Sequence, residues 1–356
     1  MRLGTDGRKL PDSINIGPVK SLEKAHGLGL AGVFFRTVVD LSPTLDAGYL
    51  REVKAKADSL GMYLEMGLGK VNPYAVPEAP ELRDLGDGDL LLGFRRMMEA
   101  CAAIDCRELW VATANRKSKY KGRVGYDRFR TDVDWRDQIA ATIKFLKRLA
   151  PIARDLGIHM NIETHEEITS FETVQVVEAV GPEVMGITFD TANVLQRAEH
   201  PIWAARRVAP YVRQSHIKDA GLGYEGPHVR YQMRPCGMGV IDFGELVEIL
   251  HRANPDLHLS IEIDQSRDEM PLGKYPSVME ITDASWLAGH PDLTKEELEA
   301  YVELVQAYQK LIDGGGRPDI VSYAARTYGH DEAMDYLRVS ADHLRKVCRE
   351  RNIPLQ

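Results

Sequence analysis

Four side chains that bind divalent metals well follow four successive apolar runs in the second half of the chain. Glu163 and Asp190 end the runs HMNIE and GITFD, and His216 and Glu262 stand in QSHI and LSIE. Three carboxylates and one imidazole suit Mn²⁺, Mg²⁺ or Co²⁺ better than a thiolate-preferring ion, and zinc also accepts such a set. A cation held there would acidify a C–H bond beside a bound carbonyl and stabilise the enediolate that forms. The pattern therefore predicts a metal centre that moves protons next to a carbonyl.

Each of these four residues also has a common structural explanation. A single Asp or Glu after a strand is usually the N-cap of the next helix or one half of an ion pair. Four consecutive runs that place such a side chain at the same end are much harder to explain in that way. Buried carboxylates gathered at one point would also repel each other unless a cation neutralised them. We therefore interpret the four residues as ligands of one shared ion.

Polar residues beside these ligands are candidates for catalysis and substrate binding. His165 lies two residues after Glu163, so an extended strand would place both side chains on one face. It could act as the general base, or it could orient a ligand through a hydrogen bond. Lys218 follows His216 at the same spacing and could bind substrate oxygens or form a salt bridge. The predicted catalytic residues are His165, Glu163, Glu262 and Lys218, and the predicted substrate-binding residues are Asn193, Asp219, Glu65 and Asn115.

Such a site requires strands whose ends converge, and the spacing of apolar residues predicts them. Short runs rich in β-branched or aromatic residues indicate strands, and the longer segments between them have helical spacing. The expected strands are residues 2–5, 32–37, 62–67, 108–113, 158–164, 185–191, 213–219 and 257–264. The clearest helices are residues 46–60, 90–104, 135–156 and 243–253. We expect Asp242 to cap the last of these and Pro151 to break or kink the third.

This alternation of strands and helices predicts an α/β fold, a (β/α)8 TIM barrel. The C-terminal strand ends of such a barrel meet at one mouth, where the four ligands would gather. Residues 1–290 are expected to form the catalytic barrel, and a polar insertion at 114–134 follows the fourth strand. Residues 291–356 are expected to form a C-terminal helical extension that packs on the barrel or on a partner subunit. GTDG at 4–7 lacks the G-x-G-x-x-G spacing of a dinucleotide-binding fold.

Composition narrows the function classes further. The 356 residues are 44% hydrophobic and carry a formal net charge of −8, so nucleic acid is a disfavoured partner. The four cysteines, at positions 101, 106, 236 and 348, form no C-x-x-C, which indicates reduced thiols in the cytosol. No secretory leader and no stretch of 18 apolar residues is present. We expect a cytoplasmic protein without membrane contact that acts on a small molecule.

Several of these segments resemble a known group of enzymes. NIETHEEITS, GITFDTAN, SHIKD, CGMGVIDF and SIEID resemble the xylose-isomerase-like TIM-barrel superfamily of sugar isomerases and epimerases, which includes sugar-phosphate enzymes. The resemblance covers roughly residues 1–265 and is strongest from 158 to 264. It implies that the four ligand residues hold one divalent ion, with Mn²⁺ ahead of Mg²⁺, Co²⁺ or Zn²⁺. It also implies a sugar or glycoside substrate.

Details of the site point to a branch of this superfamily. Its ketose 3-epimerases have a His where this chain has Asn193 and an Arg where it has Leu222. The E-x-H formed by Glu163 and His165 instead resembles the metal-binding α subunit of bacterial C-glycoside deglycosidases. That resemblance implies that His165 deprotonates a 3-oxo-glucoside next to its ketone and that the C–C bond to the aglycone breaks by elimination. The alternative is a sugar or sugar-phosphate isomerase or epimerase, which returns the proton.

Two remote alternatives come from the same superfamily. AP endonucleases use three zinc ions and further His ligands, one of which would fall at Asn193, and no D-x-H follows the strand at 213–219. A non-catalytic partner subunit is disfavoured because the ligand set is complete. Because the deglycosidases work with a small β subunit, we expect a homo- or hetero-oligomer. The amphipathic extension could supply its interface.

Overall fold

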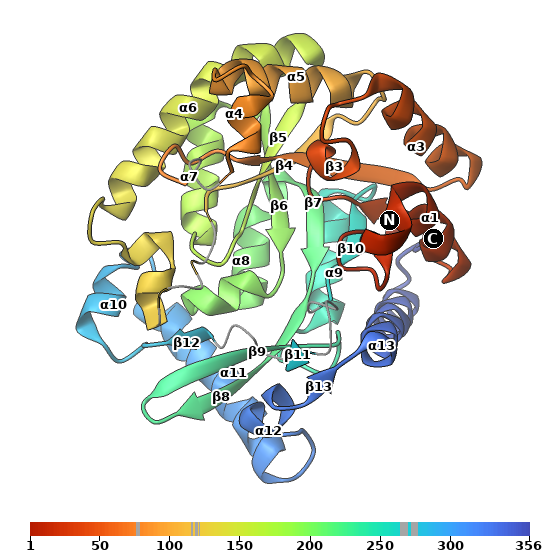
Figure 1. The fold of residues 1–356 in the computed structure, drawn as a ribbon. Coiled ribbons are helices and arrows are strands. Elements are labelled where there is room, and N and C mark those ends of the chain that lie inside the picture. The colour runs from red at the N-terminus through yellow and green to blue at the C-terminus, as the bar shows by residue number, and fades with distance from the viewer. Residues whose placement is uncertain (76–78, 115–116, 118–119, 121, 264–269, 272–276) are drawn as a thin grey trace.

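A closed barrel of eight parallel strands forms the centre of the molecule, in the order β1-β10-β7-β6-β5-β4-β3-β2 (Figure 1). The computed structural model describes residues 1–75, 79–114, 117, 120, 122–263, 270–271 and 277–356. The barrel strands are β1 (Arg2–Asp6), β2 (Gly32–Phe34), β3 (Tyr63–Lys70), β4 (Glu108–Ala112), β5 (His159–Glu163), β6 (Met185–Asp190), β7 (Val212–Ile217) and β10 (His258–Ile261). Each overlaps one of the predicted strands, so the predicted barrel is confirmed.

The register of the strands brings the ends of β5, β6, β7 and β10 to one level. Asp190 pairs with His216, and His216 pairs with Ser260, two residues before the end of the run LSIE. Glu163 pairs with Thr188 on β6. Side chains alternate between the two faces of a strand, so residues at paired positions on neighbouring strands point to the same side. The barrel interior therefore receives the predicted ligands at its C-terminal mouth.

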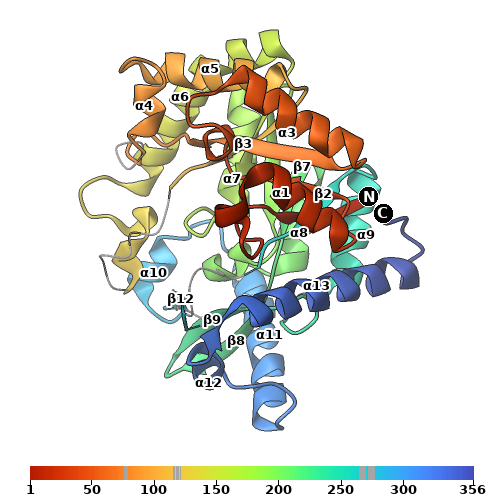
Figure 2. The same cartoon turned by 45° about the vertical axis from the view of Figure 1, so that its right-hand side comes forward.

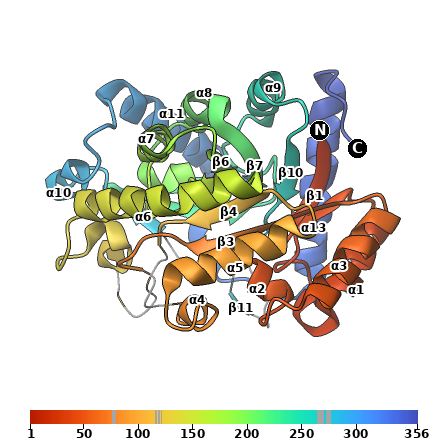
Figure 3. The same ribbon diagram turned by 90° about the horizontal axis from the view of Figure 1, so that it is seen from above.

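Helices cover the outside of the barrel. Figure 3 shows α5 and α6 lying over the strands. The helices of the barrel are α1 (Ser13–Gly27), α2 (Val38–Leu41), α3 (Ala47–Ser59), α4 (Glu81–Asp84), α5 (Leu90–Ala102), α6 (Trp135–Leu156), α7 (Ser170–Val180), α8 (Pro201–Val208) and α9 (Phe243–Ala253). The four predicted helices correspond to α3, α5, α6 and α9. The predicted break at Pro151 is absent, because Leu149 and Ala153 on either side are both buried and hold α6 against the barrel as one helix.

An antiparallel sheet that the sequence did not predict follows β7. The strands β8 (Asp219–Glu225) and β9 (His228–Arg234) form a hairpin, and β12 (Ser277–Met279) pairs with β9. A second small sheet joins β11 (Met270–Pro271) to β13 (Thr327–Tyr328). The strand predicted at 213–219 therefore divides, because β7 ends at Ile217 and the hairpin begins at Asp219.

The C-terminal extension packs against the barrel. After the short helix α10 (Ala284–Ala288), it contains α11 (Lys295–Asp313), α12 (Ile320–Ala324) and α13 (His330–Glu350). Helix α11 contacts β8, and α13 contacts α9 and β10, along the side seen in Figure 2. The chain ends beside its beginning (Figure 1), where the backbone N–H of Leu3 donates to the carbonyl of Gln356 at 2.7 Å. Among the described residues, no helix is long and apolar enough to cross a bilayer.

Two basic residues of the polar insertion, Lys117 and Arg123, form ion pairs within the protein. Lys117 Nζ lies 2.6 Å from Asp127 Oδ1. Arg123 Nη1 lies 2.7 Å from Glu280 Oε2 and 2.7 Å from Asp283 Oδ1, which ties the insertion to the segment before α10. These cations therefore serve folding contacts within the chain.

Candidate metal centre

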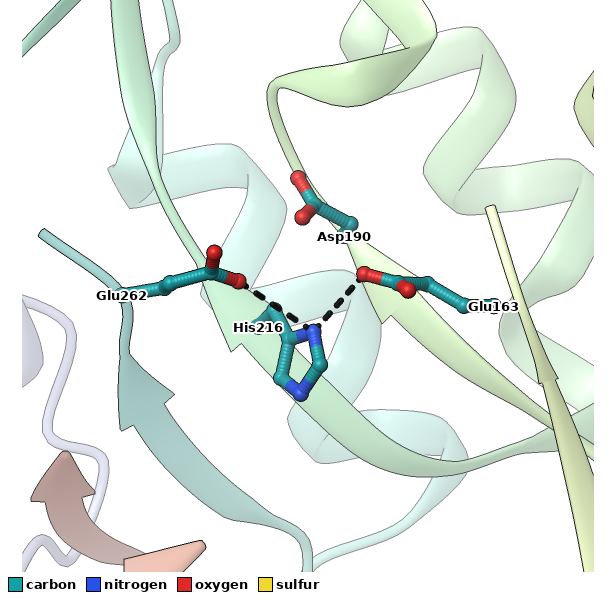
Figure 4. A group of neighbouring side chains, drawn as sticks. All are labelled: Glu163, Asp190, His216 and Glu262. Carbon is teal, nitrogen blue, oxygen red and sulfur yellow. Dashed lines mark hydrogen bonds and ion pairs between the residues drawn. The ribbon is translucent and has the colours of Figure 1, made fainter. Parts of the chain in front are cut away.

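The four predicted ligands meet at the C-terminal mouth of the barrel. Figure 4 shows the side chains of Glu163, Asp190, His216 and Glu262 pointing toward one another from β5, β6, β7 and the residue after β10. One ligand atom from each lies within 4.8 Å of all the others, and all four residues are buried. The structure therefore brings together, on four neighbouring strands, the oxygen-rich set that the sequence predicted.

His216 presents its Nδ1 atom to the carboxylates. This nitrogen lies 2.8 Å from Glu163 Oε1 and 3.4 Å from Glu262 Oε2 (Figure 4). Phe34 packs against the ring edge-on, with 4.5 Å between ring centroids. Burial alone would lower the pKa of His216, but the negative charge of Glu163 and its hydrogen bond raise it to about 9. Nδ1 is therefore the atom placed to bind a cation.

Two ammonium groups lie among the carboxylates. Lys218 Nζ lies 2.7 Å from Asp190 Oδ2 and 3.0 Å from Glu262 Oε1, and Lys9 Nζ contacts the same Glu262 oxygen. Asp6, buried at the end of β1, adds a fourth carboxylate, and burial together with the charge of Glu262 raises its pKa. Four carboxylates thus face two ammonium groups. One divalent cation would supply the missing charge, so the donor atoms, their burial and the charge balance all fit such an ion.

The ligand carboxylates are held by different partners. Trp110 Nε1 donates to Glu163 Oε2 at 2.8 Å. Burial would raise the pKa of Glu163, but the charges of His216 and His165 outweigh it and lower this pKa to about 2. Burial dominates at Asp190 and raises its pKa to about 6. The indole N–H thus fixes an ionised Glu163 in position.

His165 and Glu167 form a hydrogen-bonded pair beside the cluster. His165 Nδ1 lies 2.5 Å from Glu167 Oε2, and the second nitrogen, Nε2, lies 3.9 Å from Glu163 Oε2. Thr113 donates to the other oxygen of the fully buried Glu167. Burial would lower the pKa of His165, but the charges of Glu167 and Glu163 raise it to about 10. A divalent cation on Glu163 would oppose that field and favour the neutral imidazole.

Two predicted substrate residues are not brought to the cluster. Strand β3 continues to Lys70, so Glu65 lies near its beginning and bonds His258 Nδ1 at 2.7 Å, four residues before Glu262. Both carboxylate oxygens of Asp219 accept backbone N–H groups, including that of Gly239 at 2.8 Å. The carboxylate of Asp219 therefore holds the loop before α9. The carboxylate of Glu65 faces the N-terminal side of the barrel, where His258 lies.

Of the other two predicted substrate residues, Asn193 lies beside the cluster. Asn193 begins the short 3-10 helix η4 (Asn193–Arg197), directly beside the cluster. Its backbone N–H donates to Asp190 Oδ1 at 3.0 Å, and its side-chain oxygen accepts from Gln196 at 3.2 Å. Asn115 lies outside the described residues. Asn193 is thus the one predicted substrate residue that the described structure places beside the metal ligands.

Four residues at the mouth were not predicted as part of the site. They are Asp6, Lys9, Trp110 and Glu167. Trp110 is buried, and its N–H donates to Glu163. Asp6 ends the first strand of the barrel and Lys9 follows it, so a search of every strand end for charged residues would have found them.

A family model and two curated relatives match parts of the chain. The model described as xylose isomerase-like TIM barrel matches residues 22–283. The uncharacterized protein YihM of Escherichia coli strain K12 is 35% identical over 94 residues, which are 26% of this chain and 29% of that protein. The 3-oxo-isoapionate decarboxylase of Pectobacterium atrosepticum is 23% identical over 122 residues, which are 34% of this chain and 44% of that protein. The matches thus span less than half of either relative.

Solved structures of sugar epimerases share the fold. D-psicose 3-epimerase, crystallised in the presence of D-fructose, superposes with a TM-score of 0.58 and 17% identity, over 86% of this chain and 99% of that one. The 3-keto-D-glucoside 4-epimerase YcjR of E. coli gives a TM-score of 0.55 and 14% identity, over 86% and 98% of the two chains. At these identities the likeness shows a common fold.

Proposed function

The chain belongs to the xylose isomerase-like TIM barrel family, and we propose that it is an enzyme, dependent on one divalent cation, that removes a proton beside the carbonyl of a keto sugar. Glu163, Asp190, His216 and Glu262 would hold the ion, and Mn²⁺ suits this set. Bound there, the ion polarises a substrate carbonyl. The observation that carries the proposal is this buried cluster with the imidazole of His165 beside it.

His165 is the proposed general base. Glu167 occupies its Nδ1 atom, which leaves Nε2 directed toward the cluster, 3.9 Å from Glu163 Oε2. A proton taken by Nε2 would leave negative charge on the substrate oxygen, and the ammonium group of Lys218 is placed to stabilise it. Glu163 and Glu262 lie on opposite sides of His216 (Figure 4) and are the other proposed proton-transfer groups.

For the outcome of the reaction we propose elimination, with cleavage of the C–C bond between a 3-oxo-glucoside and its aglycone. The E-x-H arrangement of Glu163 and His165 supports it, because it supplies an imidazole base at the end of β5. The two positions that differ from the ketose 3-epimerases also support it. Asn193 bonds Gln196, and Leu222 is a buried apolar residue of β8. A small second subunit, as in the deglycosidases, belongs to this proposal.

Two other outcomes would use the same metal centre to stabilise negative charge beside a carbonyl. Return of the proton to the opposite face would be epimerisation, and the 3-keto-D-glucoside 4-epimerase that shares the fold favours this alternative. Loss of carbon dioxide from a 3-oxo acid also leaves negative charge beside a carbonyl. The decarboxylase among the matched relatives favours that reaction.

Solvent deuterium exchange tests the proposal. The Mn²⁺-loaded protein would be incubated in D₂O with methyl 3-oxo-β-D-glucoside, its 6-phosphate, the matching 3-oxo-glucuronide, D-fructose and a 3-oxo C-glucoside, and NMR would follow the hydrogens beside each carbonyl. We expect exchange with at least one substrate, its loss in Glu163→Ala, and its retention in the control Glu183→Ala, since Glu183 is an exposed residue paired with Arg154. A released aglycone indicates elimination, and a new sugar isomer indicates epimerisation. No exchange with any substrate contradicts the proposal.

A further inference from the structure

A guanidinium group that makes no hydrogen bond to the described residues lies at the mouth of the barrel. Phe34, the last residue of β2, points into the barrel and packs on His216. Arg36 stands two residues further on, so the same alternation directs it to the mouth. Its Cζ atom lies 5.8 Å from the ring centroid of Trp110, whose N–H donates to the metal ligand Glu163. Arg36 therefore stacks on the side chain that positions Glu163, close enough to the cluster to feel the charges of Glu163 and Asp6.

No carboxylate in the described part of the chain is hydrogen-bonded to Arg36. Among the residues that the structure describes, its guanidinium forms no hydrogen bond and no ion pair, and its Nε atom is buried without a partner. The carboxylate of Asp40 is used by the backbone N–H of Thr37 in a capping box. A second guanidinium, that of Arg8, adds like charge, and burial together with this charge lowers the pKa of Arg36. Holding a guanidinium this way is costly unless an anion completes the site.

The charges of the metal centre are balanced without Arg36. Two ammonium groups and one bound divalent ion would balance the four carboxylates, and His165 with Glu167 forms a pair of its own. The guanidinium group of Arg36 feels the negative charges of Asp40, Asp6 and Glu163 but is hydrogen-bonded to none of them, so its N–H donors remain open to a ligand. A guanidinium offers a planar fork of N–H donors that matches two oxygens of a carboxylate or phosphate.

We propose that Arg36, assisted by Arg8, binds an anionic oxygen group of the substrate, so that the substrate is an acidic sugar, a sugar acid or sugar phosphate. The inference rests on the proposed function, because it assumes that the sugar is held at the metal centre. The carbonyl end would lie at the cluster and the acidic group at Arg36, beside Trp110. The enzyme would then select acidic sugars over neutral ones of the same length.

Calorimetric titration of the Mn²⁺-loaded protein tests this assignment with three six-carbon probes: neutral D-glucitol, D-gluconate and D-glucitol 6-phosphate. A divalent ion by itself also binds an acid more tightly than a neutral sugar. For each protein we therefore divide the affinity for the acid by the affinity for D-glucitol. The decisive comparison is this ratio in Arg36→Gln against the same ratio in wild type. We expect this ratio to fall roughly tenfold or more for the acid that the site accepts. Arg252→Gln makes the same chemical change on the exposed face of α9 and should leave the ratio unchanged.

The outcomes separate this inference from the proposed function. A fall for D-gluconate alone identifies a carboxylate, and a fall for D-glucitol 6-phosphate alone identifies a phosphate. A ratio that Arg36→Gln leaves unchanged for both acids overturns the inference, even where deuterium exchange succeeds. An Arg36-dependent preference without exchange supports the anion site and counts against the proposed reaction. If Arg36→Gln does not fold or bind Mn²⁺, Arg8→Gln, on a half-buried loop residue, is measured in its place.

Discussion

At the scale of single residues, hydrogen bonds within the protein decide which polar atoms of the site remain available for a substrate or a cation. Glu167 takes one nitrogen of His165, so only the other can accept a proton from a substrate. Trp110 takes one oxygen of Glu163 and leaves the second for His216 and a cation. Glu167 and Trp110 thus act through a hydrogen bond to His165 or Glu163 and not on the substrate itself. Their loss should therefore change rate or affinity without removing the fold.

The His165–Glu167 pair gives a prediction for rate. His165→Gln should keep Mn²⁺ affinity within about threefold of wild type and reduce deuterium exchange by roughly 100-fold or more, since a positioned base contributes about that much. Glu167→Gln, which still offers an oxygen to the imidazole, should reduce exchange by roughly 10-fold. Glu178→Gln on α7 is the control, because that carboxylate contacts the phenol of Tyr211 on the surface. Equal losses of metal and rate in His165→Gln would show that His165 orients a ligand.

The four ligands were predictable because strand periodicity fixes both their direction and their level. Glu163, Asp190 and His216 lie on strands, and Glu262 directly follows one. Glu167 was not predictable in this way, because it lies four residues beyond β5 in a loop, where no period sets the direction of a side chain.

At the scale of elements, the β8–β9 hairpin shows where sequence patterns fail. Its first strand has glycine at alternate positions, 221 and 223, so one face has no side chains in the middle of the strand and the period of two is lost there. The structure explains these glycines. A Cβ atom at Gly221 would lie 2.8 Å from the ring of Tyr308 on α11, and one at Gly223 would lie 2.7 Å from Ile320. Because α11 and Ile320 pack so closely on this strand, only glycine fits at these two positions, and the sequence lacks the alternation that would predict a strand.

The loop before α9 gives a prediction for stability. Asp219 accepts backbone N–H groups from Ala220, Gly237, Gly239 and Ile241 with its two oxygens. Asp219→Asn would turn an amide donor toward buried N–H groups and should lower the free energy of unfolding by roughly 1–3 kcal/mol. Asp242→Asn is the matched control, since Asp242 is an exposed N-cap and Asn caps equally well. Equal effects in urea unfolding would contradict this role of Asp219.

The junction of α7, α8 and α11 gives a prediction for pH dependence. Arg207 on α8 is shared by two buried carboxylates, Glu199 at 3.1 Å and Glu297 at 2.7 Å. Burial, reinforced by the charge of Glu297, raises the pKa of Glu199 from 4.5 to about 7. A raised carboxyl pKa means that the folded state binds the proton more tightly. This contribution to stability is complete below pH 4.5 and is lost as pH rises toward about 7.

The measurement compares wild type with Glu199→Gln in urea at several pH values. The difference in unfolding free energy, wild type minus variant, should fall by roughly 1–3 kcal/mol between pH 4.5 and 7. Contributions of all other groups cancel in this difference. A flat difference, or one that rises with pH, would show that Glu199 is ionised throughout.

At the scale of the whole molecule, the extension contacts the barrel both near its first helix, α11, and at the C-terminus of the chain. Arg207 joins α8 to Glu297 of α11. Beyond α13 the chain returns to β1, where Leu3 bonds the carbonyl of Gln356 and Met1 bonds that of Pro354. The sequence predicted a helical extension over residues 291–356 but left open whether it packs on the barrel or on a partner. Helical periodicity shows that a helix has an apolar face, but it does not identify the surface that covers this face.

These contacts predict one cooperative unfolding transition. All four tryptophans, at positions 110, 135, 203 and 286, precede the extension, so their fluorescence reports on the barrel alone. Circular dichroism at 222 nm also includes α11 and α13. The two urea midpoints should coincide. A separate earlier transition in circular dichroism would show that residues 291–356 unfold independently.

Anomalous diffraction from crystals grown with Mn²⁺, measured on both sides of the manganese absorption edge, tests the metal centre most directly. We predict one strong peak within roughly 2.4 Å of a carboxylate oxygen of Glu163, Asp190 and Glu262 and of Nδ1 of His216. Lys218 Nζ should move away from the oxygens that it contacts in the metal-free arrangement. Absence of a peak at the mouth, with Lys218 still among these carboxylates, would mean that ion pairs alone hold the cluster, and the proposed chemistry would lose its basis.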